Sequence, residues 1–317
     1  MSPFASLLPV ASLLLLALSY ATAADAPDDQ AEEAAAPGQS FAYKMSGDQP
    51  RRLEVYFPPD HNPAQTKVPA IIFFHGGGWQ GGDLTQFRAA CRHFAERGLV
   101  AVTAEYRMHP KGTPDFNESG ESRKRVCITD AKSAIRWLKN KAAEFGIDPQ
   151  KVIVGGGSAG GHVAVLATRQ TGLDDPSDDT SIDTKAVAYV LFNPAFEQKD
   201  QADREVDALR HIGSDMAPAI VFFGDQDSAW LPGWDAVHAR LAEAGARVEY
   251  WQAPGHKHGF FNRTSRQRTL LQKADRFLAS LGLLQARDED APAAVGGMKL
   301  ELIPAPVADR SAKPVAE

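Results

Sequence analysis

The sequence has no hydrophobic run long enough to cross a membrane. A spanning helix needs about 20 apolar residues, whereas the longest apolar stretch, at 7–18, has about a dozen. Residues 1–24 contain no Asp, Glu, Lys or Arg, and small residues of the A-x-A type follow the stretch at 21–23. This pattern predicts a secretory signal peptide over 1–23, whose removal would leave a secreted or periplasmic protein without a membrane anchor.

The chain also lacks an excess of positive charge. Its 34 Lys and Arg are outnumbered by 40 Asp and Glu, for a net charge of −6. A nucleic-acid partner is therefore not expected, because no surplus of cations is present to neutralise phosphates. The 44% of hydrophobic and 23% of charged residues are ordinary globular values. Nothing in this composition indicates an oligomeric state.

Cysteine is scarce, with only Cys91 and Cys127 in the chain. In an oxidising compartment this even pair predicts a disulfide, with two small buried thiols as the alternative. Neither cysteine has metal-ligand spacing to a histidine. The acidic run DDPSDD at 174–179 lacks the ordered spacing of a calcium-binding EF-hand loop and is expected to be a solvated loop. No metal site and no cofactor are predicted.

Shifts in composition divide the chain into segments. Residues 24–40 are rich in Ala, Asp, Glu and Pro, which predicts a flexible linker. Residues 285–317 turn again to Ala, Pro and charge, which predicts a disordered tail apart from a short strand at 298–303. The folded domain is expected between them, at 41–284.

Within 41–284, apolar runs rich in β-formers alternate with helical patterns. An opening hairpin at 41–44 and 53–57 is followed by strands at 68–74, 99–106, 151–154, 186–192, 219–223 and 248–252. Helical periodicity is found at 84–97, 129–145, 160–170, 234–245 and 265–281. Because the middle strands are almost entirely apolar, both sheet faces should be covered. The prediction is an α/β fold with a mostly parallel central sheet and its functional site at the carboxyl ends of the strands.

The predicted strand at 151–154 runs into GGGSAGGH at 155–162, and a helix follows. Gly156, Ser158 and Gly160 fit G-x-S-x-G, the nucleophile elbow, in which a strained turn exposes the serine hydroxyl. Gly155, Gly157 and Gly160 also fit the dinucleotide fingerprint G-x-G-x-x-G. That fingerprint belongs to a first strand–helix unit, whereas here at least two strands precede it. The elbow is therefore the favoured interpretation.

A second glycine motif, HGGGW at 75–79, follows the strand at 68–74. Consecutive glycines let backbone N–H groups approach a ligand closely, as an oxyanion hole requires. Together with the elbow, this motif is far more specific than either motif alone.

A serine nucleophile needs a base, and the base needs an orienting acid. Both are expected on loops after downstream strands, in the chain order Ser, Asp, His. The loop after 219–223 offers Asp225 and Asp227, and the loop after 248–252 offers His256 and His258. These positions alone leave two candidates for each role.

The order HGGGW, GGGSAGGH, GDQD, HGFFN resembles the α/β-hydrolase superfamily, close to its hormone-sensitive-lipase-like and secreted bacterial carbohydrate-esterase branches, which include acetylxylan and feruloyl esterases. This resemblance covers about 41–284 and implies an α/β-hydrolase fold. It implies that the catalytic residues are Ser158, Asp227 and His258. It also implies an oxyanion hole formed by the N–H groups of Gly77, Gly78 and Ala159.

The segment between the strands at 186–192 and 219–223 is short and very polar, which predicts a minimal cap over an open pocket. Trp79 and Trp230 flank the motif loops and are candidates for its walls. The prediction is a secreted serine carboxylesterase without a cofactor, acting on acetyl or feruloyl esters of small molecules, oligosaccharides or polysaccharides. The alternatives are a lipase or peptidase with the same triad, or a non-catalytic carbohydrate-binding protein with this fold.

Overall fold

The computed structural model of the chain describes residues 35–287 and 298–306. The predicted signal peptide, the linker before residue 35 and the tail at 288–297 and 307–317 lie outside the described residues. Within the two described ranges, no helix is both long and apolar enough to cross a membrane.

The described strands form one sheet in the order β1-β2-β4-β3-β5-β6-β7-β8-β9. Their bounds are β1 Gln39–Ser46, β2 Gln49–Tyr56, β3 Val68–Phe74, β4 Val100–Ala104, β5 Ile147–Gly157, β6 Ala188–Phe192, β7 Ala219–Gly224, β8 Val248–Ala253 and β9 Glu301–Ile303. In this sheet order the strands from β4 to β8, with β3 among them, are all parallel. β1 and β2 form the predicted antiparallel hairpin. β1 begins inside the expected linker, and β9 confirms the short strand expected in the tail by pairing with β8.

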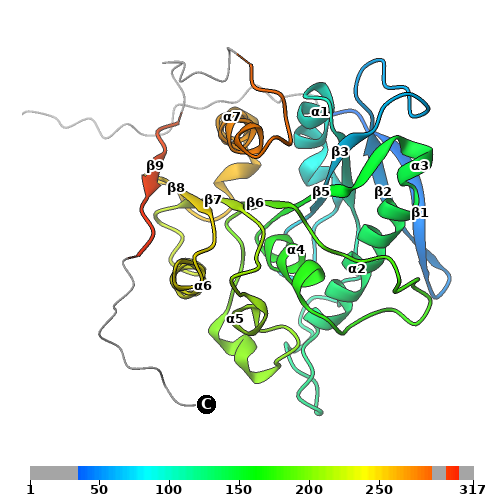
Figure 1. Cartoon of the computed structure of the whole chain (residues 1–317). Helices are drawn as coiled ribbons and strands as arrows, with labels where there is room; N and C mark the ends of the chain where they lie inside the picture. The colour runs from blue at the N-terminus through cyan, green and yellow to red at the C-terminus, as the bar shows by residue number, and fades with distance from the viewer. Residues whose placement is uncertain (1–34, 288–297, 307–317) are drawn as a thin grey trace, which may run out of the picture. The chain divides into compact units, whose positions relative to one another are not determined.

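Helices cover both faces of the sheet, as Figure 1 shows. The longer helices are α1 Arg88–Glu96, α2 Lys124–Asn140, α4 Ala159–Arg169, α6 Leu231–Glu243 and α7 Thr264–Ser280. The shorter ones are η1 Leu84–Phe87, α3 Ala142–Phe145, η2 Gln198–Ala202, α5 Ala208–His211 and η3 Phe260–Asn262. α1 and α7 enclose one hydrophobic core with the sheet, and α2, α4 and α6 enclose the other. The predicted architecture is confirmed.

The parallel strands serve both cores because successive side chains point to opposite faces. In β3, Ile71 and Phe73 join the core beneath α1 and α7, while Ile72 and Phe74 join the core beneath α2 and α4. β3 and β5 pair in register with Phe74 opposite Gly156. The two glycine motifs therefore leave the sheet at the same level, side by side.

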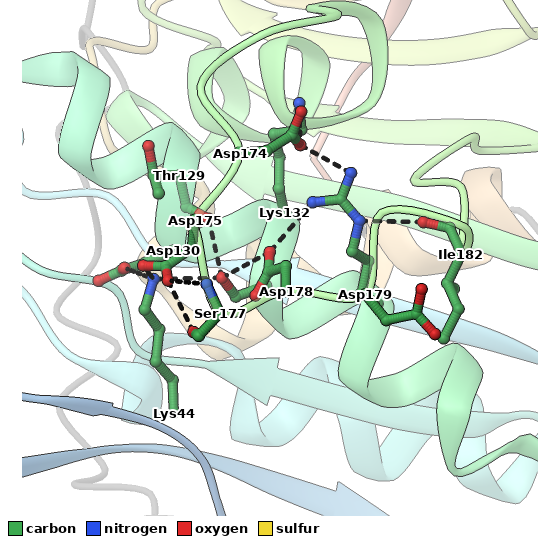
Figure 2. Close-up of polar contacts among 12 residues, drawn as sticks. Lys44, Thr129, Asp130, Lys132, Asp174, Asp175, Ser177, Asp178, Asp179 and Ile182 are labelled. Atoms are coloured by element: carbon green, nitrogen blue, oxygen red, sulfur yellow. Dashed lines mark hydrogen bonds and ion pairs between the residues drawn. The ribbon is translucent and has the colours of Figure 1, made fainter.

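The acidic run at 174–179 is tied to α2 and β1 by ion pairs, so it is not the freely solvated loop that was expected. Lys44 lies 2.7 Å from Asp130 and also pairs with Asp175, as Figure 2 shows. Lys132 and Arg136 both reach Asp174 at 2.7 Å.

α2 begins at Lys124 rather than at residue 129, because residues 124–128 extend its buried face.

The predicted disulfide is wrong, since Cys91 and Cys127 are both free and buried. Cys91 lies on α1 in one hydrophobic core, and Cys127 lies on α2 in the other. The sheet separates the two cores, and a disulfide requires Cα atoms within about 7 Å. Burial raises the pKa of the Cys91 thiol and raises that of Cys127 to about 12. Both residues are small buried hydrophobes, which was the alternative interpretation.

Candidate active site

Ser158 occupies the tight turn between β5 and α4. Its φ of 53° and ψ of −122° are an unusual backbone conformation for a residue with a side chain. Such conformations persist only where the surrounding structure holds them. Two hydrogen bonds anchor the turn: the N–H of Ser158 donates to Phe192 O at 2.9 Å, and its carbonyl accepts from the N–H of Ala195 at 2.9 Å. The hydroxyl is thereby fixed at the carboxyl end of the sheet.

His258 and Asp227 complete a hydrogen-bonded chain with this serine. His258 Nε2 lies 2.8 Å from Ser158 Oγ, and His258 Nδ1 lies 2.7 Å from Asp227 Oδ2. Because an ionised carboxylate only accepts hydrogen bonds, Nδ1 carries the proton and Nε2 is left to accept from the hydroxyl. Asp227 is 2% exposed and Ser158 is 9% exposed, whereas the side chain of His258 retains 33% of its accessible surface. The structure thus brings together the three side chains predicted from the sequence.

The two alternative residues have other partners. Asp225 Oδ1 accepts the N–H of Gly255 at 2.7 Å. His256 Nδ1 lies 2.8 Å from the carbonyl of Pro254 and donates to it. The first contact joins the β7 and β8 loops and the second lies within the β8 loop. The geometry therefore favours Asp227 and His258 for the two roles.

The HGGGW loop after β3 lies against the serine turn. Gly77 and Gly78 have φ of 127° and 63°, and a Cβ on Gly77 would lie 2.1 Å from the carbonyl oxygen of Gly81. His75 fixes the start of the loop: its ring stacks on Tyr106 at 4.4 Å and its Nδ1 donates to the carbonyl of Gly76 at 2.8 Å. Burial lowers the pKa of His75, which keeps the ring neutral. Across the turn, Ala159 is the first residue of α4, where a backbone N–H has no helical partner.

Similar proteins of known structure or sequence include several esterases. The family model BD-FAE matches residues 53–191. Among solved structures, Thermogutta terrifontis esterase 2 is 33% identical with a TM-score of 0.72, and the match covers 80% of this chain and 98% of that one. The chain belongs to the hormone-sensitive-lipase-like α/β-hydrolases. This confirms the predicted fold class and family.

Curated α/β-hydrolase relatives match over much of the chain at lower identity. Esterase LipQ of Mycobacterium tuberculosis is 27% identical over 71% of this chain. The matched region covers 58% of LipQ's own length. The ethyl acetate hydrolase of Pseudomonas putida is 27% identical, over 70% of this chain and 74% of that protein.

One residue of this α/β-hydrolase site was missed in the sequence. Asn193 follows β6, is completely buried and donates from Nδ2 to Asp227 Oδ2 at 2.6 Å. Its φ of 43° lies in the left-handed region that asparagine tolerates better than most residues. The same carboxylate oxygen therefore accepts from both Asn193 and His258, which fixes its orientation. Its place directly after an apolar strand is a weak local signal, because ordinary loop residues share it.

The two tryptophans occupy different depths. Trp230 is half-buried, and its ring centroid lies 5.8 Å from that of His258, so it can form a wall of the site. Trp79 is only 2% exposed and packs against Trp230 with ring centroids 6.0 Å apart. It can shape a pocket only through the residues that it contacts.

Lys124 attaches the segment between β6 and β7 to the body of the domain. Its Nζ is buried 4.0 Å from the centroid of the Trp79 ring, lies 2.5 Å from Glu197 Oε2 and also pairs with Asp200. Nearby, burial lowers the pKa of His162 to about 3, so its neutral ring donates from Nε2 to the carbonyl of Val206 at 2.9 Å. The cap is therefore short and held in place by buried polar contacts.

A cleft of about 540 Å³ lies between this cap and α6. Its rim carries polar side chains, among them Gln198, Lys199 and Gln201. Apolar parts of Phe196 and Val237 also line it. Ala229, next to Trp230 in the chain, lines this cleft, whereas Ser158, Asp227 and His258 do not.

Proposed function

We propose that this protein is a serine carboxylesterase whose triad is Ser158, His258 and Asp227. The observation that carries the proposal is the unbroken hydrogen-bonded chain from Ser158 Oγ through the imidazole to Asp227, with distances of 2.8 and 2.7 Å. Its position beside a glycine loop at the carboxyl ends of parallel strands adds support, as does the esterase family.

The geometry suggests the following steps. His258 Nε2 takes the proton from Ser158 Oγ as the oxygen attacks the ester carbonyl, and the N–H groups of Gly77, Gly78 and Ala159 stabilise the oxyanion. Asp227 holds the imidazolium through Nδ1. His258 then gives its proton to the leaving alcohol. In the second half-reaction it activates water, which releases the acid and restores the serine.

The test is hydrolysis of 4-nitrophenyl acetate by the purified protein and by matched pairs of variants. Ser158→Ala should lower kcat by about 10⁴–10⁶-fold, and Asp227→Asn by about 10⁴-fold. Asp225→Asn and His256→Gln are the controls, since these residues lie on the same loops with other partners. Near wild-type turnover by Ser158→Ala would refute the assignment. A wild-type protein inert across ester and amide substrates would favour a non-catalytic binding protein.

For the substrate, we propose a short acyl group, acetyl or feruloyl, on a carbohydrate alcohol. One relative, Thermogutta terrifontis esterase 2, has structures with propionate and with butyrate bound, and another is named for ethyl acetate; both support short acyl chains. The polar rim of the cleft beside the cap supports an alcohol rich in hydroxyl groups. Acetylated xylan and methyl ferulate should be hydrolysed, and 4-nitrophenyl palmitate slowly. Preference for palmitate would indicate a lipase, and preference for an amide would indicate a peptidase.

We also propose that the protein is exported, because residues 1–23 have the pattern of a signal peptide. Amino-terminal sequencing of protein recovered from the periplasm or medium should start at residue 24. Recovery of the intact chain from the cytoplasm alone would contradict this.

A further inference from the structure

The side chain of Gln86 touches both loops that the proposed mechanism uses. Its Oε1 accepts the N–H of Gly76 at 2.6 Å, within the HGGGW loop. Its Nε2 donates to Asn262 Oδ1 at 2.8 Å. Asn262 ends η3, which follows His258, and its own N–H donates to Gly259 O at 3.0 Å. One carboxamide thus links the glycine loop to the histidine loop.

The backbone that carries Gln86 is itself firmly placed. It lies in η1, whose N-cap Asp83 accepts the N–H of Thr85 at 2.8 Å. The next residue, Phe87, is fully buried and stacks on Phe73 with centroids 4.8 Å apart. The carboxamide therefore projects from a fixed base, and its two hydrogen bonds can transmit that fixed position to the loops.

Gly76 is where this contact can affect the chemistry. A Cβ at Gly76 would lie 3.1 Å from Ser158 Cβ and 3.6 Å from Gln86 Nε2, so the loop is in contact with both residues. Gly76 directly precedes Gly77 and Gly78, whose N–H groups are the proposed oxyanion donors. The hydrogen bond from the Gly76 N–H to Gln86 Oε1 fixes the stretch of backbone that directly precedes these two donors.

We propose that Gln86 is a positioning residue that sets the oxyanion donors and His258 in register across Ser158; this rests on the proposed function. A carboxamide can make both hydrogen bonds at once, because it has an acceptor oxygen and a donor nitrogen on the same planar group. Its effect should appear in the transition state, since the oxyanion forms there and not in the bound ester.

The experiment measures kcat and KM for 4-nitrophenyl acetate with the full-length protein. Gln86→Met keeps the length of the side chain and removes both hydrogen bonds. It should lower kcat by about 10–100-fold, less than complete loss of a donor, and leave KM within about threefold. The inhibition constant of a trifluoromethyl ketone, whose adduct places an oxyanion in the hole, should rise by the same factor as kcat/KM falls. Gln272→Met, an exposed glutamine on α7, is the matched control.

The partner residue gives a second, independent pair of variants. Asn262→Asp keeps an acceptor for Gln86 Nε2 and should retain kcat within about threefold, whereas Asn262→Leu should lose about tenfold. This pair decides the matter if Gln86→Met does not fold. Wild-type kcat in both Gln86→Met and Asn262→Leu would overturn the positioning role while leaving the esterase assignment intact. A wild-type protein without esterase activity would overturn both.

Discussion

Gly160 allows the serine turn to lie directly against the end of β3. A Cβ built on Gly160 would lie 2.0 Å from Phe74 O and 2.5 Å from His75 O. Both are backbone atoms, so no side-chain rotation can relieve the overlap. Ordinary contact begins near 3.4 Å, and the two backbones must therefore separate by about 1.4 Å, the difference between 3.4 and 2.0 Å. Gly160→Ala should thus move the elbow away from the HGGGW loop.

Two effects are expected from this displacement. Overpacking of this kind costs about 1–3 kcal/mol of the free energy of unfolding. A misplacement of about 1 Å between reacting groups can lower turnover about 100-fold. The sign of the stability change is informative, because alanine in place of glycine at an unobstructed helix position would raise the free energy of unfolding by about 1 kcal/mol.

Urea unfolding and hydrolysis of 4-nitrophenyl acetate measure the two effects on Gly160→Ala. Gly81→Ala is the control in the neighbouring loop, where a Cβ would meet only Gly77 O at 3.6 Å. It should change stability by less than about 0.5 kcal/mol and leave kcat within about threefold. If Gly160→Ala were as stable and active as wild type, the tight contact between elbow and β3 would not be what places the serine.

Three further predictions follow from individual contacts. Asn193→Leu should lower kcat by about 10–100-fold, because a hydrogen bond to a charged group is worth about 1.5–3 kcal/mol and Asn193 holds Asp227; unchanged kcat would contradict this. Burial raises the pKa of Asp200 from 3.8 to about 6, so the folded state binds the extra proton, and this one group should lower the free energy of unfolding by up to about 3 kcal/mol as pH rises from 4 to 7. Because the lowered pKa of His162 acts in the opposite direction over the same range, the test is the difference in urea stability between wild type and Asp200→Asn at each pH; a difference that does not change with pH would contradict the assignment. Cys91 and Cys127 should resist a thiol reagent in the native protein, both should react in denaturant, and reduction should leave the mass unchanged.

The fold and the residues of the proposed triad could be predicted because each depends on local pattern plus one general rule. β7 is apolar along its whole length and β5 is apolar over residues 152–157, and such strands lie in the middle of a parallel sheet. The residues directly after them, including Ser158 and Asp227, must then meet at the same edge. Neither step requires knowledge of strand order.

Gln86 and Asn193 escaped prediction for a different reason. Gln86 is separated in sequence from both of its partners, and its role depends on how η1 and η3 approach each other. Asn193 follows a strand, but only the distance to Asp227 distinguishes it from an ordinary loop residue. Side chains that hold a reacting group in place are recognised by tertiary contacts, which no local pattern encodes.

The disulfide prediction was wrong because the number of cysteines carries no information on strand order, and the same strand order places the site. The chain runs from β3 to β4 on one side of β3, and then crosses to β5 on the other side. Right-handed crossovers in opposite directions place their helices on opposite faces, which separates Cys91 on α1 from Cys127 on α2. The loops after β3 and β5 likewise diverge toward opposite faces. Ligands of open α/β sheets bind where such loops diverge, and Ser158 lies there beside Gly76. The topology that forbids the disulfide therefore also sets the place of the proposed active site.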